Sequence, residues 1–220
     1  MKSAIVLLSG GKDSAVAFYL ALIEYERVWA LSIDHPGRPR REALAAKQLA
    51  ARTGTTLIAP TLPFMFTSEK GYTGLLAESL PIVTKESAYI PMRNLLFYGV
   101  AGFYAEVHQV NTIVVGSYQG EGITYPDASQ NFLRKMEEVF ALSLSRGYLG
   151  KCTQITFQTP LLNYDEYEVV KLGQDLGVPF ELTWSCWRDQ EKPCDQCYSC
   201  EERARVFSRA NISSQKAEEL

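Results

Sequence analysis

Short apolar runs alternate along the chain with longer stretches in which apolar residues recur every three or four positions. The runs have the length of strands and lack regular polar alternation, which is typical of strands buried on both faces of a parallel sheet. Strands that alternate with helices in this way predict an α/β domain with helices on both faces of the sheet. The five expected strands are residues 4–8, 28–33, 56–59, 112–115 and 155–159.

The helical stretches between these runs carry apolar stripes that we expect to face the core. Apolar side chains spaced at i, i+3 or i+4 and i+7 lie on one side of a helix. By this rule the first helix buries Val16, Leu20 and Ile23, the helix after residue 92 buries Leu96, Val100, Phe103 and Val107, and the helix after residue 129 buries Phe132, Met136, Val139 and Phe140.

The composition is that of an ordinary globular protein with one domain and an appendage. The chain has 220 residues, of which 46% are apolar and 21% charged, enough for a sizeable core. A net charge of −3 gives no sign of nucleic-acid binding. No stretch reaches the roughly 18 apolar residues of a membrane span, and the first apolar run is too short for a signal peptide. We therefore expect a cytoplasmic protein whose direct partners include neither a membrane nor a nucleic acid.

The strongest chemical signal is the segment Ser9–Ser14, SGGKDS, between the first strand and the first helix. Adjacent glycines let backbone N–H groups converge on an anion, and the helix N-terminus adds its positive dipole end. A carboxylate beside phosphate is repulsive unless a cation bridges the two, so Asp13 implies Mg²⁺. The spacing fits neither a Walker A loop nor G-x-G-x-x-G. It resembles the PP-loop of ATP pyrophosphatases, which split ATP between its α and β phosphates; a glycine-rich turn is the alternative.

Further candidates lie near other strand ends, at the edge where open α/β sheets bind ligands. Asp34 ends the second strand and Arg38 follows it. Arg93 and Asn94 open a helix, where a cation is unfavourable unless an anionic ligand is present. Asp127 precedes another helix. The alternatives are a solvated helix start for Arg38, a surface arginine and a capping asparagine for Arg93 and Asn94, and an N-cap for Asp127.

Two loops complete the expected ligand-binding edge. Residues 116–122 follow the fourth strand and contain three glycines. Residues 61–89 show no periodicity, and a connection of that length is usually functional or mobile. We interpret it as a lid or substrate loop, with disorder as the alternative, and Lys85 within it is a weaker candidate for contact with an anion. A planar substrate ring would need an aromatic face, for which Tyr118 and Tyr125 are the candidates.

A cluster of cysteines near the C-terminus indicates a structural metal site. Four thiolates close a tetrahedral Zn²⁺ shell and leave no position for water, so the ion would stabilise the fold of this segment. An iron–sulfur cluster is the alternative for the same ligands. The fifth cysteine, Cys152, stands apart and is interpreted as a core thiol. The expected ligands are Cys186, Cys194, Cys197 and Cys200, with the spacing C-x7-C-x2-C-x2-C.

Taken together, the motifs resemble the QueC family of 7-cyano-7-deazaguanine synthases over nearly the whole chain. The resemblance implies a Rossmann-like, adenine nucleotide alpha hydrolase-like PP-loop domain at residues 1–182, a zinc-binding subdomain at 183–220, and a homodimer. It is carried by SGGKDS, the acidic strand end at Asp34, IPMRN at 90–94, YPD at 125–127, TPLL at 159–162, LGVPFELTWSC at 176–186 and the cysteine spacing.

The resemblance also implies a reaction and its cofactors. The family adenylates 7-carboxy-7-deazaguanine with ATP, converts it to the amide with ammonia, and dehydrates the amide to the nitrile with a second ATP. ATP, Mg²⁺ and Zn²⁺ are therefore expected. Lys12, Asp13, Arg93 and Asp127 are the expected catalytic residues. The expected ATP-binding residues are Leu8, Ser9, Gly10, Gly11, Lys12, Asp13, Ser14, Asp34, Arg38, Asn94, Gly116 and Tyr118.

Several positions near the expected substrate site depart from the family pattern. Glu166 stands where a lysine is usual, Tyr118 and Glu121 replace an asparagine and an aspartate, Ala128 replaces a cysteine, and residues 35–37 read His-Pro-Gly in place of Tyr-Gly-Gln. ATP and zinc binding are thus better supported than the identity of the product.

Three alternatives to nitrile synthesis remain open. QueC-like paralogues of bacterial defence systems are thought to join the activated deazaguanine acid to other amines, such as a protein N-terminus. A PP-loop tRNA-modifying enzyme is a second alternative, although it would need catalytic cysteines near the loop. A non-catalytic nucleotide sensor is the third, and it has no need of Asp13.

Overall fold

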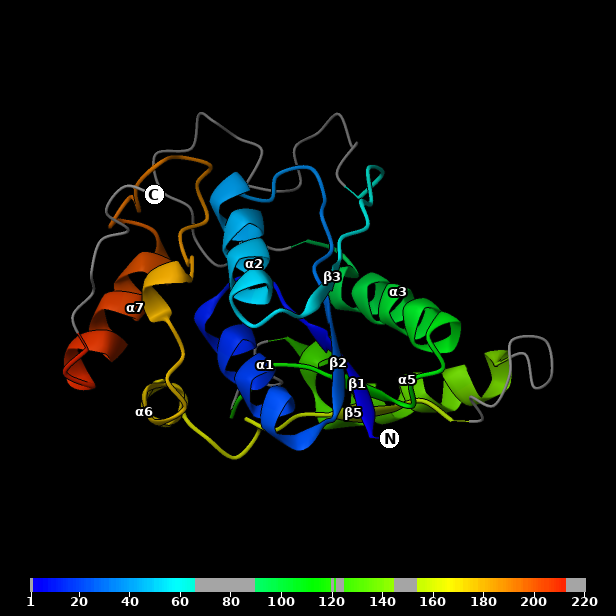
Figure 1. The fold of residues 1–220 in the computed structure, drawn as a ribbon. Coiled ribbons are helices and arrows are strands. Elements are labelled where there is room, and N and C mark those ends of the chain that lie inside the picture. The colour runs from blue at the N-terminus through cyan, green and yellow to red at the C-terminus, as the bar shows by residue number, and fades with distance from the viewer. Residues whose placement is uncertain (1, 66–89, 120, 122–124, 145–153, 213–220) are drawn as a thin grey trace.

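The five expected strands form one parallel sheet in the order β3-β2-β1-β4-β5 (Figure 1). The computed structural model describes residues 2–65, 90–119, 121, 125–144 and 154–212. The order reverses at β1, so the segment that follows β1 lies at the topological switch point where such sheets bind ligands. The strands are β1 (Ser3–Leu7), β2 (Arg27–Leu31), β3 (Thr56–Ile58), β4 (Thr112–Val114) and β5 (Thr156–Gln158).

Helices cover both faces of the sheet, as the sequence predicts. Because side chains alternate along a strand, Ala4 and Val6 pack with α1, α6 and α7, while Ile5 packs with α3 and α5. Two hydrophobic layers therefore enclose β1, which explains its unbroken apolar run. The α-helices are α1 (Lys12–Glu24), α2 (Arg40–Arg52), α3 (Arg93–Val107), α5 (Gln130–Ser143), α6 (Glu166–Asp175) and α7 (Tyr198–Arg209), and the 3₁₀ turns are η1 (Pro126–Ala128) and η2 (Phe180–Leu182).

The apolar stripes predicted for α1, α3 and α5 are partly wrong. Ile23 is 74% exposed, Phe103 61%, Val139 51% and Val107 46%. Helix α3 instead buries a face of mostly small residues, namely Tyr98, Ala101, Gly102 and Ala105. Small side chains let the helix approach its neighbours closely: a Cβ on Gly102 would lie 2.7 Å from the Phe140 ring of α5. Close packing thus turned the small face inward and left the larger apolar residues outside.

The C-terminal helix shares the core of the α/β body. Phe207 and Val206 of α7 are each 1% exposed and pack with α1 and α6. A separate small cluster joins Trp184 and three of the cysteines to Ala45 of α2. The domain boundary at residue 182 stays a prediction. Most of the proposed lid at 61–89, including Lys85, and also Cys152, lie outside the described residues. Among the described helices, none is long and apolar enough to cross a membrane.

Gly10 allows the loop after β1 to lie directly against α2. Its φ is +103°, a region that side chains disfavour. A Cβ at this position would lie 2.3 Å from the Glu42 carbonyl oxygen and 2.9 Å from the Ala46 nitrogen. These neighbours are backbone atoms of a helix, which cannot move aside as a flexible side chain can. A glycine is therefore required here by both conformation and space.

We predict that Gly10→Ala lowers the free energy of unfolding by about 2–4 kcal/mol, because left-handed strain adds to backbone overlap. Gly54→Ala is the matched control, since Gly54 has φ +67° but no atom within 4 Å of the position that the added methyl group would take. It should lose only the strain energy, about 1–2 kcal/mol. Urea unfolding followed by circular dichroism measures both, and equal losses would contradict the overlap.

Candidate active site and cysteine cluster

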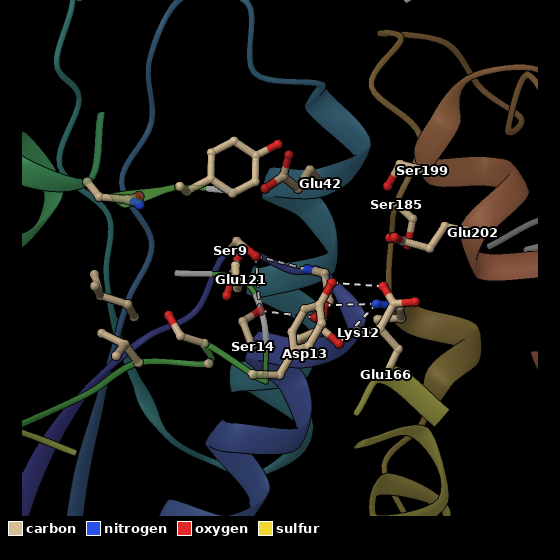
Figure 2. A pocket seen from close by; sticks show the side chains of 18 of the residues that line it. Ser9, Lys12, Asp13, Ser14, Glu42, Glu121, Glu166, Ser185, Ser199 and Glu202 are labelled. Atoms are coloured by element: carbon tan, nitrogen blue, oxygen red, sulfur yellow. Dashed lines mark hydrogen bonds and ion pairs between the residues drawn. The ribbon is translucent and has the colours of Figure 1, made fainter. Parts of the chain in front are cut away.

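A cavity of about 720 Å³ opens at the carboxyl ends of the strands, around the SGGKDS loop (Figure 2). Its volume is in the range of cofactor and small-molecule sites. Gly10 and Asp34 do not line it: Gly10 packs against α2, and the exposed Asp34 pairs through its backbone with residues 60–62. The other predicted ligand-binding and catalytic residues do line it, namely Leu8, Ser9, Gly11, Lys12, Asp13, Ser14, Arg38, Arg93, Asn94, Gly116, Tyr118 and Asp127.

The loop's own hydroxyl groups hold it open at the start of α1. Ser9 Oγ and Ser14 Oγ are 3.0 Å apart, and the Gly11 N–H donates to Ser9 Oγ at 3.1 Å. Ser14 Oγ also donates to the Gly11 carbonyl at 3.0 Å. Gly116 lets the exit of β4 approach this turn, because a Cβ there would lie 3.1 Å from the Asp13 backbone. The loop is thus shaped before any anion binds.

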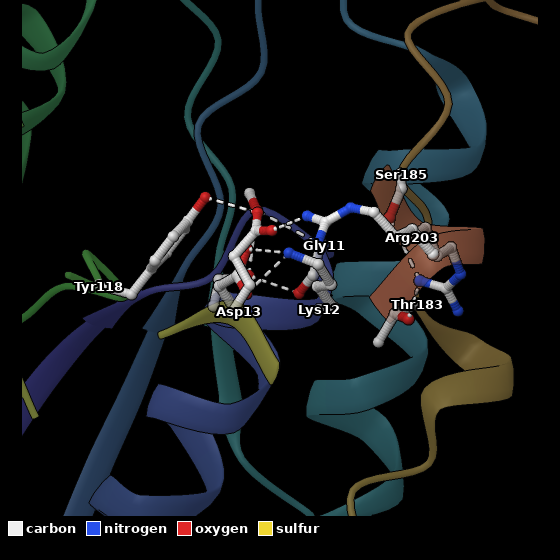
Figure 3. A network of polar contacts seen from close by, with 11 residues as sticks. Gly11, Lys12, Asp13, Tyr118, Thr183, Ser185 and Arg203 are labelled. Carbon is white, nitrogen blue, oxygen red and sulfur yellow. Dashed lines mark hydrogen bonds and ion pairs between the residues drawn. The ribbon is translucent and has the colours of Figure 1, made fainter. Parts of the chain in front are cut away.

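Lys12 is buried beneath the cavity and pairs with its neighbour in sequence. Its Nζ lies 2.9 and 3.0 Å from the two carboxylate oxygens of Asp13 (Figure 3). Burial lowers the pKa of Lys12, but the Asp13 carboxylate, with smaller contributions from Glu202 and Glu166, raises it, and the net shift is upward. Lys12 therefore stays charged, and an incoming phosphate would meet a cation whose present partner is a carboxylate.

Arg38 braces the loop from the side of β2. The Arg38 guanidinium donates to the Ser9 carbonyl, to the Ile33 carbonyl at 2.9 Å and to Ser32 Oγ at 3.0 Å. Its side chain is 4% exposed, and Glu42 lies 3.8 Å from its Nε. Arg38 is therefore not a solvated residue at the start of a helix. Arg38 fixes the backbone of the loop and presents only a small part of itself to the cavity.

The start of α3 and the turn η1 meet across the cavity. Asn94 Nδ2 donates to Asp127 Oδ1 at 3.1 Å. Asp127 is not the cap of α5, because Ser129 takes that position and accepts from the Phe132 N–H. The cap of α3 is Met92, with φ 57° and no side-chain hydrogen bond. The first turn of α3, which begins at Arg93, is therefore available to an anion.

A second polar cluster lies on the far side of the loop and joins Tyr118 to α6 and α7. Tyr118 donates to Glu166 Oε1 at 2.8 Å, and Arg205 donates to Glu166 Oε2 at 2.6 Å. Burial and a hydrogen bond with Glu166 raise the pKa of Glu202 to about 7. Burial raises the pKa of Glu166, but its polar neighbours, Glu202 and Tyr118, and the positive charges of Lys12 and Arg205 together lower the pKa overall. Glu166 and Glu202 thus lie close enough for each to shift the pKa of the other.

Sequence reasoning missed the part that α7 plays in this cluster. Tyr198, Glu202, Arg205 and Arg209 are spaced at i, i+4, i+7 and i+11, which places them on one face of the helix, and all four line the cavity. The spacing was readable in the sequence. That this face meets the loop became visible only when α7 was placed against α6 and α1.

The four cysteines come together as the spacing predicts. Their sulfur atoms all lie within 4.8 Å of one another, and Cys194 Sγ and Cys200 Sγ are 3.9 Å apart. Zn–S bonds of about 2.3 Å at tetrahedral angles require sulfur separations of about 3.8 Å. Backbone N–H groups of Arg188 and Cys194 donate to Cys186 Sγ, each at 3.4 Å. The set fits a closed metal site with partly compensated thiolate charge.

The cysteine segment is tied to the loop through Trp184 and to α7 through Arg203. The backbone N–H of Trp184 donates to the Gly10 carbonyl at 2.9 Å. Arg203 donates to Thr183 Oγ1 at 2.8 Å, to Ser185 Oγ at 3.2 Å and to the Phe180 carbonyl at 2.8 Å (Figure 3). Burial lowers the pKa of Arg203 to about 10. The cysteine segment is therefore a wall of the same cavity.

Glu121 provides a test of the charge balance at this site. Burial, with repulsion from Asp13, raises the pKa of Glu121 to about 7. A raised carboxyl pKa means that the native state holds a proton that the unfolded state releases above about pH 4.5, so this residue lowers stability as pH rises toward 7. We predict that Glu121→Gln removes up to about 3 kcal/mol of this pH-dependent decline in the free energy of unfolding.

Urea unfolding of wild type and variant at about pH 5 and pH 8 measures the effect, with the variant gaining stability at the higher pH. Glu26→Gln is the control, because Glu26 is an exposed residue remote from the cavity. A pH dependence of Glu121→Gln identical to that of the control would show that Glu121 is ionised in the native protein.

The amino-acid sequence matches the family model of the queuosine biosynthesis protein QueC over residues 3–211. Two relatives named 7-cyano-7-deazaguanine synthase are each 34% identical. The protein of Acaryochloris marina aligns over 226 residues, 96% of this chain and 96% of its own. That of Persephonella marina aligns over 220 residues, 96% of this chain and 94% of its own.

Solved structures of more distant proteins share the fold. NMN synthetase from Francisella tularensis has a TM-score of 0.51 at 16% identity, with 100% of this chain and 87% of that chain covered. A 4-thiouridine synthetase, solved with RNA and ATP, has a TM-score of 0.55 at 16% identity, covering 96% of this chain and 50% of that chain. These identities show the fold alone. The family model and the 34% identical relatives show more: the chain belongs to the QueC family.

Proposed function

We propose that this protein uses ATP to adenylate the carboxylate of 7-carboxy-7-deazaguanine and then joins the activated acid to ammonia, as a 7-cyano-7-deazaguanine synthase. The observation that carries this proposal is the intact SGGKDS loop, with Lys12 and Asp13 at the floor of the cavity. The names of the 34% identical relatives support 7-cyano-7-deazaguanine as the product.

In this proposal the loop binds the pyrophosphate end of ATP. N–H groups of the loop and the start of α1 donate to phosphate oxygens, and Lys12 neutralises charge on the departing pyrophosphate. Asp13 would hold Mg²⁺. The raised pKa of nearby Glu121 supports this, because it indicates an excess of negative charge that a cation would offset. The nucleoside extends toward His35 and Phe97, whose rings lie 5.8 Å apart beside Arg38.

The acid's carboxylate attacks the α-phosphorus and displaces pyrophosphate. Arg93, at the uncapped start of α3, offsets repulsion between the two anions, and Asp127 orients Asn94 beside it. Ammonia then displaces AMP to give the amide. In nitrile formation a second ATP activates the amide oxygen, which leaves as part of the second AMP.

A protein amine is the alternative acceptor, in place of ammonia. The observation that favours it is the set of contacts among the atypical residues: Glu166 accepts from Tyr118 and from Arg205. A negative group thus replaces the lysine usual in the family at the edge of the cavity. A changed charge at this edge of the cavity alters the electrostatic field in which the activated acid would react with its amine.

Two alternatives of another class find less support. A tRNA-thiolating enzyme needs a catalytic cysteine near the loop, and the cysteines within the described residues all belong to the metal cluster. A nucleotide sensor does not need Asp13 to pair with a buried Lys12. We also propose a homodimer, supported by the exposed apolar side chains Phe103 and Val107 of α3 and Val139 and Leu142 of α5.

We propose that the cysteine cluster holds Zn²⁺ in a structural role. The four sulfurs close the coordination shell, so no open position remains for substrate. The hydrogen bond from Trp184 to Gly10 then transmits the order of this segment to the loop. Zinc would contribute to activity by holding a wall of the cavity in place.

The proposed reaction is tested by supplying 7-carboxy-7-deazaguanine, ATP and Mg²⁺ and measuring AMP and pyrophosphate. We predict acid-dependent release of both, lowered at least about 10²-fold by Asp13→Ala, because the lost charge stabilisation acts in the transition state. Asp175→Ala, an exposed acid on α6, is the control. Activity of Asp13→Ala within a few-fold of wild type would contradict the assignment.

Mass spectrometry of the product separates the acceptors in the same experiment. The nitrile, formed with ammonia, identifies a synthase, while an amide adduct with an added peptide amine identifies the paralogue. Acid-independent ATP cleavage, or none, rules out this substrate.

For the metal we predict nearly one equivalent of zinc by elemental analysis. Cys194→Ser should lose both the metal and solubility, because metal binding contributes directly to folding. Cys152→Ser, the same change outside the cluster, should retain the metal. Iron with sulfide in place of zinc would support the cluster alternative, and a well-folded protein without metal would refute the site.

A further inference from the structure

The cavity has two walls on opposite sides of the loop. One lies toward β2 and α3 and carries His35 and Phe97, where the proposed function places the nucleoside of ATP. The other is built by α6, the cysteine segment and α7. Figure 2 shows Glu166, Ser185, Ser199 and Glu202 gathered on that second side, next to Lys12 of the loop. If ATP occupies the first wall, the second is left for the acid.

The second wall carries an aromatic pair held by the metal cluster. The rings of Trp187 and Tyr198 are stacked, with centroids 6.1 Å apart and planes at 23°. Both residues line the cavity, and Tyr198 is 37% exposed. Each is bonded directly to a cysteine of the cluster, Cys186 and Cys197 respectively. The pair is therefore fixed in position before a ligand arrives, which lowers the entropy cost of stacking a planar ring.

A carboxyl group lies one helical turn beyond this pair. Glu202 follows Tyr198 at i+4 on α7 and also lines the cavity. Both oxygens of Glu166 are already engaged, one by Tyr118 and one by Arg205. Glu202 instead lies beside Tyr198 on the same face of α7 and contacts Glu166 within the wall. A ligand with N–H donors can replace those contacts.

We propose that Trp187, Tyr198 and Glu202 form the subsite for the deazaguanine ring. The ring stacks on the aromatic pair, and the two adjacent N–H donors of its guanine-type edge bind the Glu202 carboxylate. The carboxyl group of the acid lies at the opposite end of the ring system from this edge, inside the same cavity as the loop. This assignment rests on the proposed function and adds the residues that select the base.

The chemistry favours a guanine-type over an adenine-type ring. A carboxylate offers only acceptors, which match two neighbouring N–H donors. An adenine-type edge places an acceptor beside its donor, so one carboxylate oxygen would face a lone pair. The buried acceptor would then be left unpaired, a cost that gives large discrimination.

Calorimetric titration with 7-carboxy-7-deazaguanine, in the presence of a non-hydrolysable ATP analogue, tests the subsite on the metal-loaded protein. We expect Glu202→Gln to raise Kd about 10- to 100-fold, because a bidentate pair is lost. Trp187→Leu should raise it about 10-fold through lost stacking. Glu201→Gln, an exposed neighbour on α7 that does not line the cavity, should bind like wild type.

The two hypotheses fail in different ways. Wild-type levels of binding by folded, zinc-loaded Glu202→Gln and Trp187→Leu would overturn the subsite and leave the proposed function standing. Absence of acid binding by the wild type would overturn both. Binding of the ATP analogue serves as the folding check: it should stay unchanged in each variant, and weakened analogue binding by Glu202→Gln would place ATP on this wall and refute the subsite.

Discussion

The site depends on the close approach of one glycine-containing turn to three segments distant in sequence. Gly10 lies against the α2 backbone with no room for a Cβ, and its carbonyl accepts from Trp184. The Ser9 carbonyl accepts from Arg38. Backbone groups that lack a partner are costly when buried, so these contacts fix the turn from outside and leave its inward N–H groups for an anion. The cysteine segment is one of the three supports, which makes it part of the candidate active site.

The fold was predictable because its signals are local. An apolar run, a glycine pair and a helical period in sequence order predict a strand, a turn and a helix, and parallel pairing follows from the helical connections. The helix faces were less predictable. Phe103 and Val107 continue a regular apolar stripe yet are exposed, because the small residues around Gly102 pack more closely. Periodicity identifies a face without saying whether the core or another surface covers it.

The same difference between local signals and long-range packing separates the cavity-lining residues that the sequence predicted from those that it did not predict. Lys12, Asp13, Arg93 and Asp127 lie at strand ends or helix starts, and their convergence follows from the topology of a parallel sheet. Glu202 and its neighbours on α7 reach the cavity only through long-range packing of that helix on α1 and α6. The sequence of α7 alone does not indicate whether its polar face lines a cavity or faces solvent.

The atypical residues form one physical unit. The Tyr118 hydroxyl and the Arg205 guanidinium both bind the Glu166 carboxylate, and the Tyr118 ring lies 5.6 Å from Lys12 Nζ. A lysine at position 166 would meet Arg205 and the buried charge of Lys12, so the glutamate and its partners are mutually required. Replacing a cation by an anion changes the local charge by two units at the edge of a partly buried site, where electrostatic interactions are weakly screened. In the proposed reaction, adenylation at the loop would tolerate this change because Lys12 remains paired with Asp13, whereas the acyl adenylate would react with its amine in the altered field.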